Sequence, residues 1–214
     1  MKKYILGAIA VASIGAAVPA MATTYVNEAA FLAAAGTPLT LESFEATPNV
    51  TGAPVVFAGG TVTCTGTNYC SSFSGTRQIG NATNGNVTAY FASPDRITFT
   101  FSTAITSFGI DVIDLGTAGA TNFSLTYAGG TTTLFSNYTG GGTLFAGLVD
   151  ANGFTSVSFT GTANGDGIDF DRLRYGTAVA AVPETATWGM MILGFGMIGA
   201  ASRSHKVKTT VAYA

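Results

Sequence analysis

The chain has 214 residues, of which only 9% are charged, and a formal net charge of −2. Residues 23–182 hold ten acidic residues, four arginines and neither lysine nor histidine, so this segment carries a net charge of −6. Such a composition argues against nucleic-acid binding, which needs basic side chains to contact phosphates. It also argues against hydrolases that use a histidine or lysine base and against the usual zinc sites. We therefore predict a protein that is not an enzyme and has no cofactor, with calcium as the one candidate ion.

Residues 1–22 have the pattern of a secretory signal peptide. Two lysines precede an apolar stretch over 5–18, and Ala20-Met21-Ala22 has the small-x-small form of a cleavage site. The apolar stretch is shorter than the ~20 residues that a transmembrane helix needs. We expect export, with a mature chain that begins at Thr23.

Residues 23–181 are predicted to form one exported domain that is all-β apart from a short N-terminal helix. Asn27 and Gly36 are suitable residues to begin and end that helix. Farther along, apolar and polar residues alternate, as in Ile97–Ser102, with the period of half-buried antiparallel strands. Many short strands separated by glycine turns favour an antiparallel β-sandwich of the jelly-roll type. A parallel β-helix is the alternative, but the segment has no fixed repeat.

The segment Tyr127–Thr132 is predicted to form a two-residue β-hairpin. Its two glycines, Gly129 and Gly130, permit the positive φ angles that such turns require. The expected register places Leu125 opposite Leu134, which keeps apolar side chains on one face of the hairpin.

Cys64 and Cys70 are the only cysteines. An even number of cysteines in an exported chain predicts a disulfide, which here closes a small loop. The alternative is a metal or redox pair. It is disfavoured because the spacing is not C-x-x-C and the only histidine, His205, lies beyond the apolar C-terminal segment.

The densest group of acidic residues is Asp166, Asp169 and Asp171, on a glycine-containing segment. Carboxylate and carbonyl oxygens on such a loop suit Ca²⁺, although the EF-hand spacing is absent. The segment resembles the closing strand of jelly-roll carbohydrate-binding modules. That resemblance implies a structural calcium shared with an acid on the first strand, here Glu42 or Glu45. The alternative is an ordinary strand with exposed aspartates.

The same segment has an unusual apolar pattern. Ile168 and Phe170 share one parity, whereas Leu173 and Tyr175 share the other. A regular strand would turn half of these side chains to solvent, so we predict a β-bulge near Asp171-Arg172.

Aromatic rings are the usual means of recognising sugars, because they stack on apolar sugar faces. The domain offers Tyr69, Tyr90, Tyr138 and Tyr175 but no tryptophan. The alternative is that these rings pack inside the domain or on its strand faces.

Near the C-terminus, residues 186–202 carry no charge and span about 26 Å as a helix, close to the ~30 Å of a bilayer core. Trp188 lies near the start of this segment, and Arg203 opens a basic cluster that the positive-inside rule places in the cytoplasm. We predict a single C-terminal transmembrane helix over about 186–202 and a cytoplasmic tail at 209–214. A buried core helix is the alternative, because the segment is short and rich in glycine.

The segment 182–208 resembles the PEP-CTERM sorting signal in its PEPxxWA form. The residues that carry the resemblance are Val182, Pro183, Glu184, Trp188 and Arg203. Thr185 stands where the family pattern has a second proline. The resemblance implies processing by an exosortase, a membrane protease of exopolysaccharide-producing Gram-negative bacteria. It also implies a precursor anchored in the inner membrane that later reaches the periplasm, cell surface or extracellular matrix.

Together these features predict an exported, non-enzymatic protein of the cell surface or the exopolysaccharide matrix. A carbohydrate-binding, lectin-like module with or without structural calcium is the second hypothesis. A glycosidase that works with two carboxylates is the third, since that chemistry needs neither histidine nor lysine.

Overall fold

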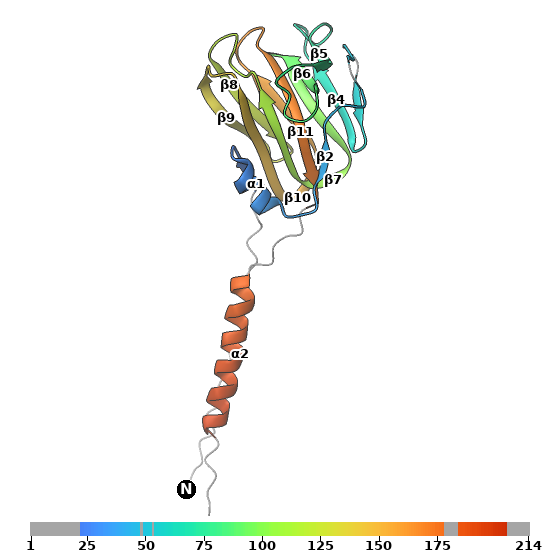
Figure 1. Ribbon diagram of the computed structural model, residues 1–214. Coiled ribbons are helices and arrows are strands. Elements are labelled where there is room, and N and C mark those ends of the chain that lie inside the picture. The colour runs from blue at the N-terminus through green and yellow to red at the C-terminus, as the bar shows by residue number, and fades with distance from the viewer. Residues whose placement is uncertain (1–21, 48, 53, 178–183, 205–214) are drawn as a thin grey trace, which may run out of the picture.

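The computed structural model describes residues 22–47, 49–52, 54–177 and 184–204, which form eleven strands and two helices (Figure 1). Their bounds are β1 Thr23–Tyr25, α1 Glu28–Ala35, β2 Thr40–Glu42, β3 Val55–Phe57, β4 Gly60–Thr65, β5 Ser74–Gln78, β6 Val87–Ala92, β7 Arg96–Ile113, β8 Thr121–Tyr127, β9 Gly130–Tyr138, β10 Thr143–Gly161, β11 Gly167–Gly176 and α2 Glu184–Ser204. The predicted signal peptide, apart from Ala22, and the predicted tail lie outside the described residues.

All eleven strands join in one curled, antiparallel sheet with a β-sandwich-like shape (Figure 1). The strand order is β5-β6-β11-β7-β10-β8-β9, with β1 paired to β10, β2 to β11, and β4 to both β3 and β7. The prediction of a mainly antiparallel β domain is therefore confirmed.

Two long strands make the sheet curl. β7 has 18 residues and β10 has 19. The first half of β7 pairs with β4 and its second half with β11, while β10 pairs with β1 near its start and with β8 near its end. Each long strand thus contributes to two layers, which we call the β11 layer (β5, β6, β11, β1, β2) and the β8 layer (β3, β4, β8, β9).

Phenylalanine rings fill the space between the layers. Phe99 and Phe159, from the β8 side, lie 5.6 and 5.2 Å from Phe170 of β11, measured between ring centroids. All three side chains are fully buried. Aromatic pairs at such distances contribute beyond the area they bury, so this cluster holds the layers together.

The predicted β-bulge is confirmed in β11. Asp171 and Arg174, three positions apart, pair with residues of β7 that are only two positions apart. Arg172 supplies the extra residue and has φ 49°, which is uncommon for a residue other than glycine. The bulge lets the apolar residues on both of its sides point into the core; these are Ile168, Phe170, Leu173 and Tyr175.

The β8–β9 hairpin is confirmed, but its predicted register is wrong by two residues. Leu125 pairs with Thr132 instead of Leu134. The turn closes one residue earlier than expected, because Gly130 pairs with Tyr127 and so belongs to the strand.

The N-terminal helix α1 begins and ends as predicted. The Asn27 side chain accepts a hydrogen bond from the Ala30 amide (3.0 Å), and Gly36 follows with φ 70°. Phe31 of α1 packs on the sheet at Gly109 and Gly147, where a Cβ atom would come within 3 Å of its ring. These two glycines allow the helix to lie close to the β11 layer.

The C-terminal helix α2 has 21 residues and covers the segment predicted to be helical. Its large apolar side chains are exposed, which contradicts the alternative of a buried core helix; they are Met190, Met191, Ile192, Leu193, Phe195, Met197 and Ile198. Within the described ranges, no helix combines the length and apolarity needed to cross a membrane. The transmembrane prediction for 186–202 is therefore not supported.

Candidate ligand-binding pocket

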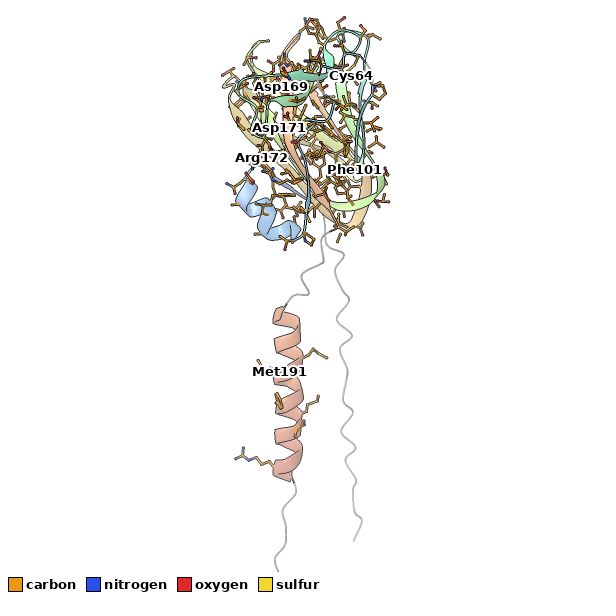
Figure 2. The ribbon with its side chains drawn as sticks, turned by 45° about the vertical axis from the view of Figure 1, so that its right-hand side comes forward. Cys64, Phe101, Asp169, Asp171, Arg172 and Met191 are labelled. Atoms are coloured by element: carbon orange, nitrogen blue, oxygen red, sulfur yellow. A yellow bond between two sulfur atoms is a disulfide. The ribbon has the colours of Figure 1, made fainter. Side chains whose placement is uncertain are left out.

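A mainly apolar pocket lies beside β5 and β6, at the end of the domain that Cys64 and Asp169 mark in Figure 2. Its volume is about 180 Å³. The residues that line it come from β5, β6, the disulfide loop and the segment after it, and the start of β11 with the turn before it; they are Tyr69, Phe73, Arg77, Tyr90, Phe91, Ala92, Gly165 and Gly167.

Three aromatic side chains, together with one arginine, form much of the pocket wall. Tyr69 and Phe73 meet edge to face with ring centroids 6.0 Å apart, and 54% of the Phe73 surface is exposed. The guanidinium carbon of Arg77 lies 4.9 Å from the centroid of the Tyr90 ring, a cation–π contact. The exposed Phe73 ring and the half-buried Tyr69 ring provide flat apolar surfaces for a ligand, whereas the buried Tyr90 ring lies under Arg77.

Arg77 is held in place by Asp169, which is fully buried. Arg77 Nε donates to Asp169 Oδ1 (2.8 Å), and Nη2 donates to Oδ2. Thr88 Oγ1 also donates to Asp169 Oδ1 (2.7 Å). The hydrogen bonds from Arg77 to Asp169 raise the pKa of the guanidinium, so Arg77 stays charged and fixed in orientation.

The loop that carries Tyr69 is anchored twice. The predicted disulfide between Cys64 and Cys70 is present, with Cα atoms 5.4 Å apart. The buried carboxylate of Asp95 accepts hydrogen bonds from the backbone amides of Tyr69 (2.6 Å), Cys70 (2.9 Å) and Asn68 (3.3 Å). Burial raises the pKa of Asp95, but these hydrogen bonds outweigh it and lower the pKa below its usual value.

The five acids predicted to bind calcium do not come together as one group of potential ligands in the described part of the chain. Each accepts hydrogen bonds from a different set of donors, mainly backbone amides: Glu42 from Phe44, Glu45 from Asn86 and Val87, Asp166 from Gly116 and Ala118, Asp169 from Arg77, and Asp171 from Asn84. Apart from Phe44, these donors lie far from their acids in the sequence, so sequence spacing could not reveal this.

The group of potential ligands that the described residues do form is Cys64, Cys70 and Asp95. Both sulfur atoms belong to the disulfide, so neither is a thiolate. The Asp95 oxygens already accept several hydrogen bonds. We therefore assign this group to the anchoring of the Tyr69 loop.

A second polar cluster lies where α1 meets the β11 layer, beside Arg172 in Figure 2. Glu28 of α1 accepts from Arg172 (2.6 Å) and Arg174 (2.5 Å), and both arginines also pair with Asp111. Burial raises the pKa of Asp111 and of its neighbour across the strands, Asp171.

Glu28, Asp111 and Arg172 help to line an open groove of about 460 Å³. A glycosidase needs two carboxylates, and this groove contains two. Both are ion-paired with arginines that join the helix to the sheet. This pairing is the geometry of a structural clamp.

Two of the four tyrosines considered for sugar binding, Tyr69 and Tyr90, line the pocket. Tyr175 instead packs in the core, and the Tyr138 hydroxyl donates to the Gly141 carbonyl (2.9 Å). Sequence reasoning missed Phe73 and Arg77, because no local pattern distinguishes them from other loop and strand residues.

The residues of the predicted sorting motif lie at the start and end of α2. Glu184 begins the helix, Trp188 lies in its second turn, and Arg203 is in its last turn. Val182 and Pro183 lie outside the described residues.

No known protein-family model matches the chain, and no curated protein matches it. Solved structures that resemble part of the chain include the K2 cleaved adhesin domain of Lys-gingipain, with 13% identity over 65% of this chain and 100% of that domain, at a TM-score of 0.42. Another is the M60 catalytic domain of Clostridium perfringens ZmpB with its CBM51 domains, with 13% identity over 57% of this chain and 15% of that one, at a TM-score of 0.38. Likenesses this distant say nothing about function.

Proposed function

We propose that the protein is an exported surface or matrix protein whose β domain binds carbohydrate in the aromatic pocket. The observation that carries this proposal is the combination of Tyr69, Phe73 and Tyr90 with one oriented arginine around a small, mainly apolar cavity. Ligand pockets typically combine apolar and aromatic walls with a few fixed polar groups. Sugars fit such a site because pyranose rings have an apolar face and a rim of hydroxyls.

A non-enzymatic role goes with this proposal. The pocket contains aromatic side chains and a paired arginine, and the two carboxylates of the other groove serve as ion-pair partners. That the β domain is of the jelly-roll type, and that it binds a structural calcium ion, are predictions. Calcium dependence is tested by repeating the binding measurement after EDTA treatment.

The export part of the proposal is supported by the disulfide, because such bonds persist in oxidising, extracytoplasmic compartments. The sorting part depends on the resemblance of 182–208 to PEP-CTERM signals. Mass spectrometry of the mature protein tests it: exosortase processing predicts a new C-terminus near Pro183-Glu184. A mature chain that still ends at Ala214 would contradict it.

Binding is tested on a glycan array with the wild-type protein and a Phe73→Ala variant. Phe73 is 54% exposed, so its removal costs little stability but takes away one wall of the pocket. Leu41→Ala is a matched control, because Leu41 is also 54% exposed and lies on β2, outside the pocket. We expect Phe73→Ala alone to lose binding. Equal binding by all three proteins would contradict the pocket assignment.

A further inference from the structure

The pocket geometry also indicates which carbohydrates fit. We infer that it takes a single neutral sugar residue at a chain end or branch, and that it discriminates against acidic sugars and against the interior of long chains. This inference rests on the proposed function and concerns the same pocket.

The charges around the pocket disfavour an acidic sugar. Arg77 is the one charged side chain that lines the pocket, and two of its nitrogens are engaged by the buried carboxylate of Asp169. An acidic sugar would therefore meet an arginine whose charge is already compensated. A second buried carboxylate, that of Asp95, accepts from the backbone amide of Tyr69, and residues 23–182 carry a net charge of −6. The field at the pocket does not favour an anion.

Recognition of sugar hydroxyls needs hydrogen-bond donors and acceptors but no uncompensated charge. Asp169 engages the N–H of Nε and one N–H of Nη2, so the second N–H of Nη2 and both N–H groups of Nη1 are left for ligand oxygens. On the other side, the Tyr69 hydroxyl donates to Asn164 Oδ1 (3.3 Å), so its oxygen is still able to accept. A donor and an acceptor beside apolar rings suit a neutral polyol ring.

The volume of the pocket limits how much of a carbohydrate can enter it. The pocket measures about 180 Å³, well below the roughly 300–1,000 Å³ of sites that hold drug-sized ligands. One pyranose ring fits in that space, and a second linked ring would lie outside it. The part of a polysaccharide that enters the pocket is thus a single sugar residue at a chain end or on a branch.

Gly167 offers a way to change this volume without disturbing the fold. A Cβ atom added there would have only Arg77 Nη2 nearby, at 3.9 Å, and Gly167 does not have positive φ. Gly165, in contrast, has φ 75° and little room beside the Tyr69 hydroxyl. Gly167→Ala therefore fills part of the cavity at small structural cost. Gly80 is a matched control, since an added Cβ has nothing within 4 Å and the residue is not in the pocket.

The experiment is calorimetric titration of the exported protein and its Gly167→Ala and Gly80→Ala variants. The probes are methyl glycosides of neutral hexoses, the corresponding uronic acids, and linear oligosaccharides of the hexose that binds best. We expect neutral monosaccharides to bind in a salt-independent manner, uronic acids to bind more weakly, and affinity not to grow with chain length. Gly167→Ala should weaken binding by about tenfold, and Gly80→Ala should not.

Tighter, salt-sensitive binding of uronic acids would overturn the inference, as would affinity that increases with each added residue. The proposed carbohydrate-binding function would survive either result. If the wild-type protein bound none of these carbohydrates, that result would instead overturn the proposed function itself. Unchanged affinity in Gly167→Ala would show that the sugar does not occupy this cavity.

Discussion

The outer faces of the two layers carry different kinds of polar residue. Outside the β11 layer, charged side chains such as Asp169, Asp171 and Asp111 are buried under loops and α1. Outside the β8 layer, the outward positions are almost all hydroxyls, with Arg96 as the one charge among them. These hydroxyl residues follow neighbouring strands in register; they are Thr61, Thr63, Thr65, Thr98, Thr100, Ser124, Thr126, Thr131, Thr133, Ser156, Ser158 and Thr160.

The two faces satisfy their polar groups in different ways. On the β8 face, hydroxyls bond across strands, as between Thr98 and Ser158 (2.9 Å) or Thr126 and Thr131 (2.9 Å), and water reaches most of them. On the β11 face, each buried carboxylate needs an arginine or several N–H donors, because an unpaired charge out of water is costly. A variant that removes one partner should therefore have unequal effects on the two faces.

The largest expected effect is that of Arg77→Met. The change leaves the fully buried carboxylate of Asp169 without its ion-pair partner. Because 39% of the Arg77 side chain is exposed, we expect a loss near the low end of the range for such pairs, about 3 kcal/mol of the free energy of unfolding. Chemical denaturation measures it.

The matched change on the hydroxyl face is Thr98→Val. It removes one hydrogen-bond partner of the buried Ser158 but leaves no unpaired charge, so we expect a loss of only about 1 kcal/mol. Equal losses for both variants would show that the two faces do not differ in the way described.

A smaller effect is expected where N–H donors alone hold a buried carboxylate. The pKa of Asp95 is lower in the folded protein than in the unfolded chain. Its contribution to stability is therefore fully present above the unfolded pKa and is lost as the pH falls through the folded pKa. We expect Asp95→Asn to cost about 2 kcal/mol at neutral pH. The difference from wild type should shrink in acid, as urea unfolding at several pH values would show. A pH-independent difference would contradict this account.

The smallest effect concerns the bulge on the β11 face. Arg172 has φ 49°, a conformation that costs residues with a Cβ roughly 1–2 kcal/mol. Arg172→Ala and Arg172→Gly both lose the ion pairs to Glu28 and Asp111. Glycine should nevertheless be the more stable of the two by about 1 kcal/mol, although it is the poorer strand residue elsewhere. Thermal unfolding of the two variants tests this expectation. A higher melting temperature for Arg172→Ala than for Arg172→Gly would contradict it.

Much of this architecture could be predicted from local patterns. The helix cap at Asn27, the disulfide and the bulge at Asp171-Arg172 each depend on residues close together in the sequence. The parity change from Phe170 to Leu173 is such a pattern, because burying both requires an extra residue between them.

The exact pairing of strands was less accessible. The β8–β9 hairpin was expected, but its register differed by two residues, because a turn can close one position earlier at almost no local cost. The positions of the five acids considered for calcium were hard to predict for a related reason: most of the donors that engage them lie far away in the sequence.

The sequence by itself therefore determined what short-range chemistry dictates: where strands alternate, where a helix begins, which cysteines pair and where a strand must bulge. Only the tertiary structure decided that Tyr69, Phe73, Arg77 and Tyr90 surround one cavity and that Asp169 fixes the arginine. The physical reason is that these contacts arise when a curled sheet brings β5, β6 and β11 side by side. Their register depends on the packing of the whole core, which no local pattern encodes.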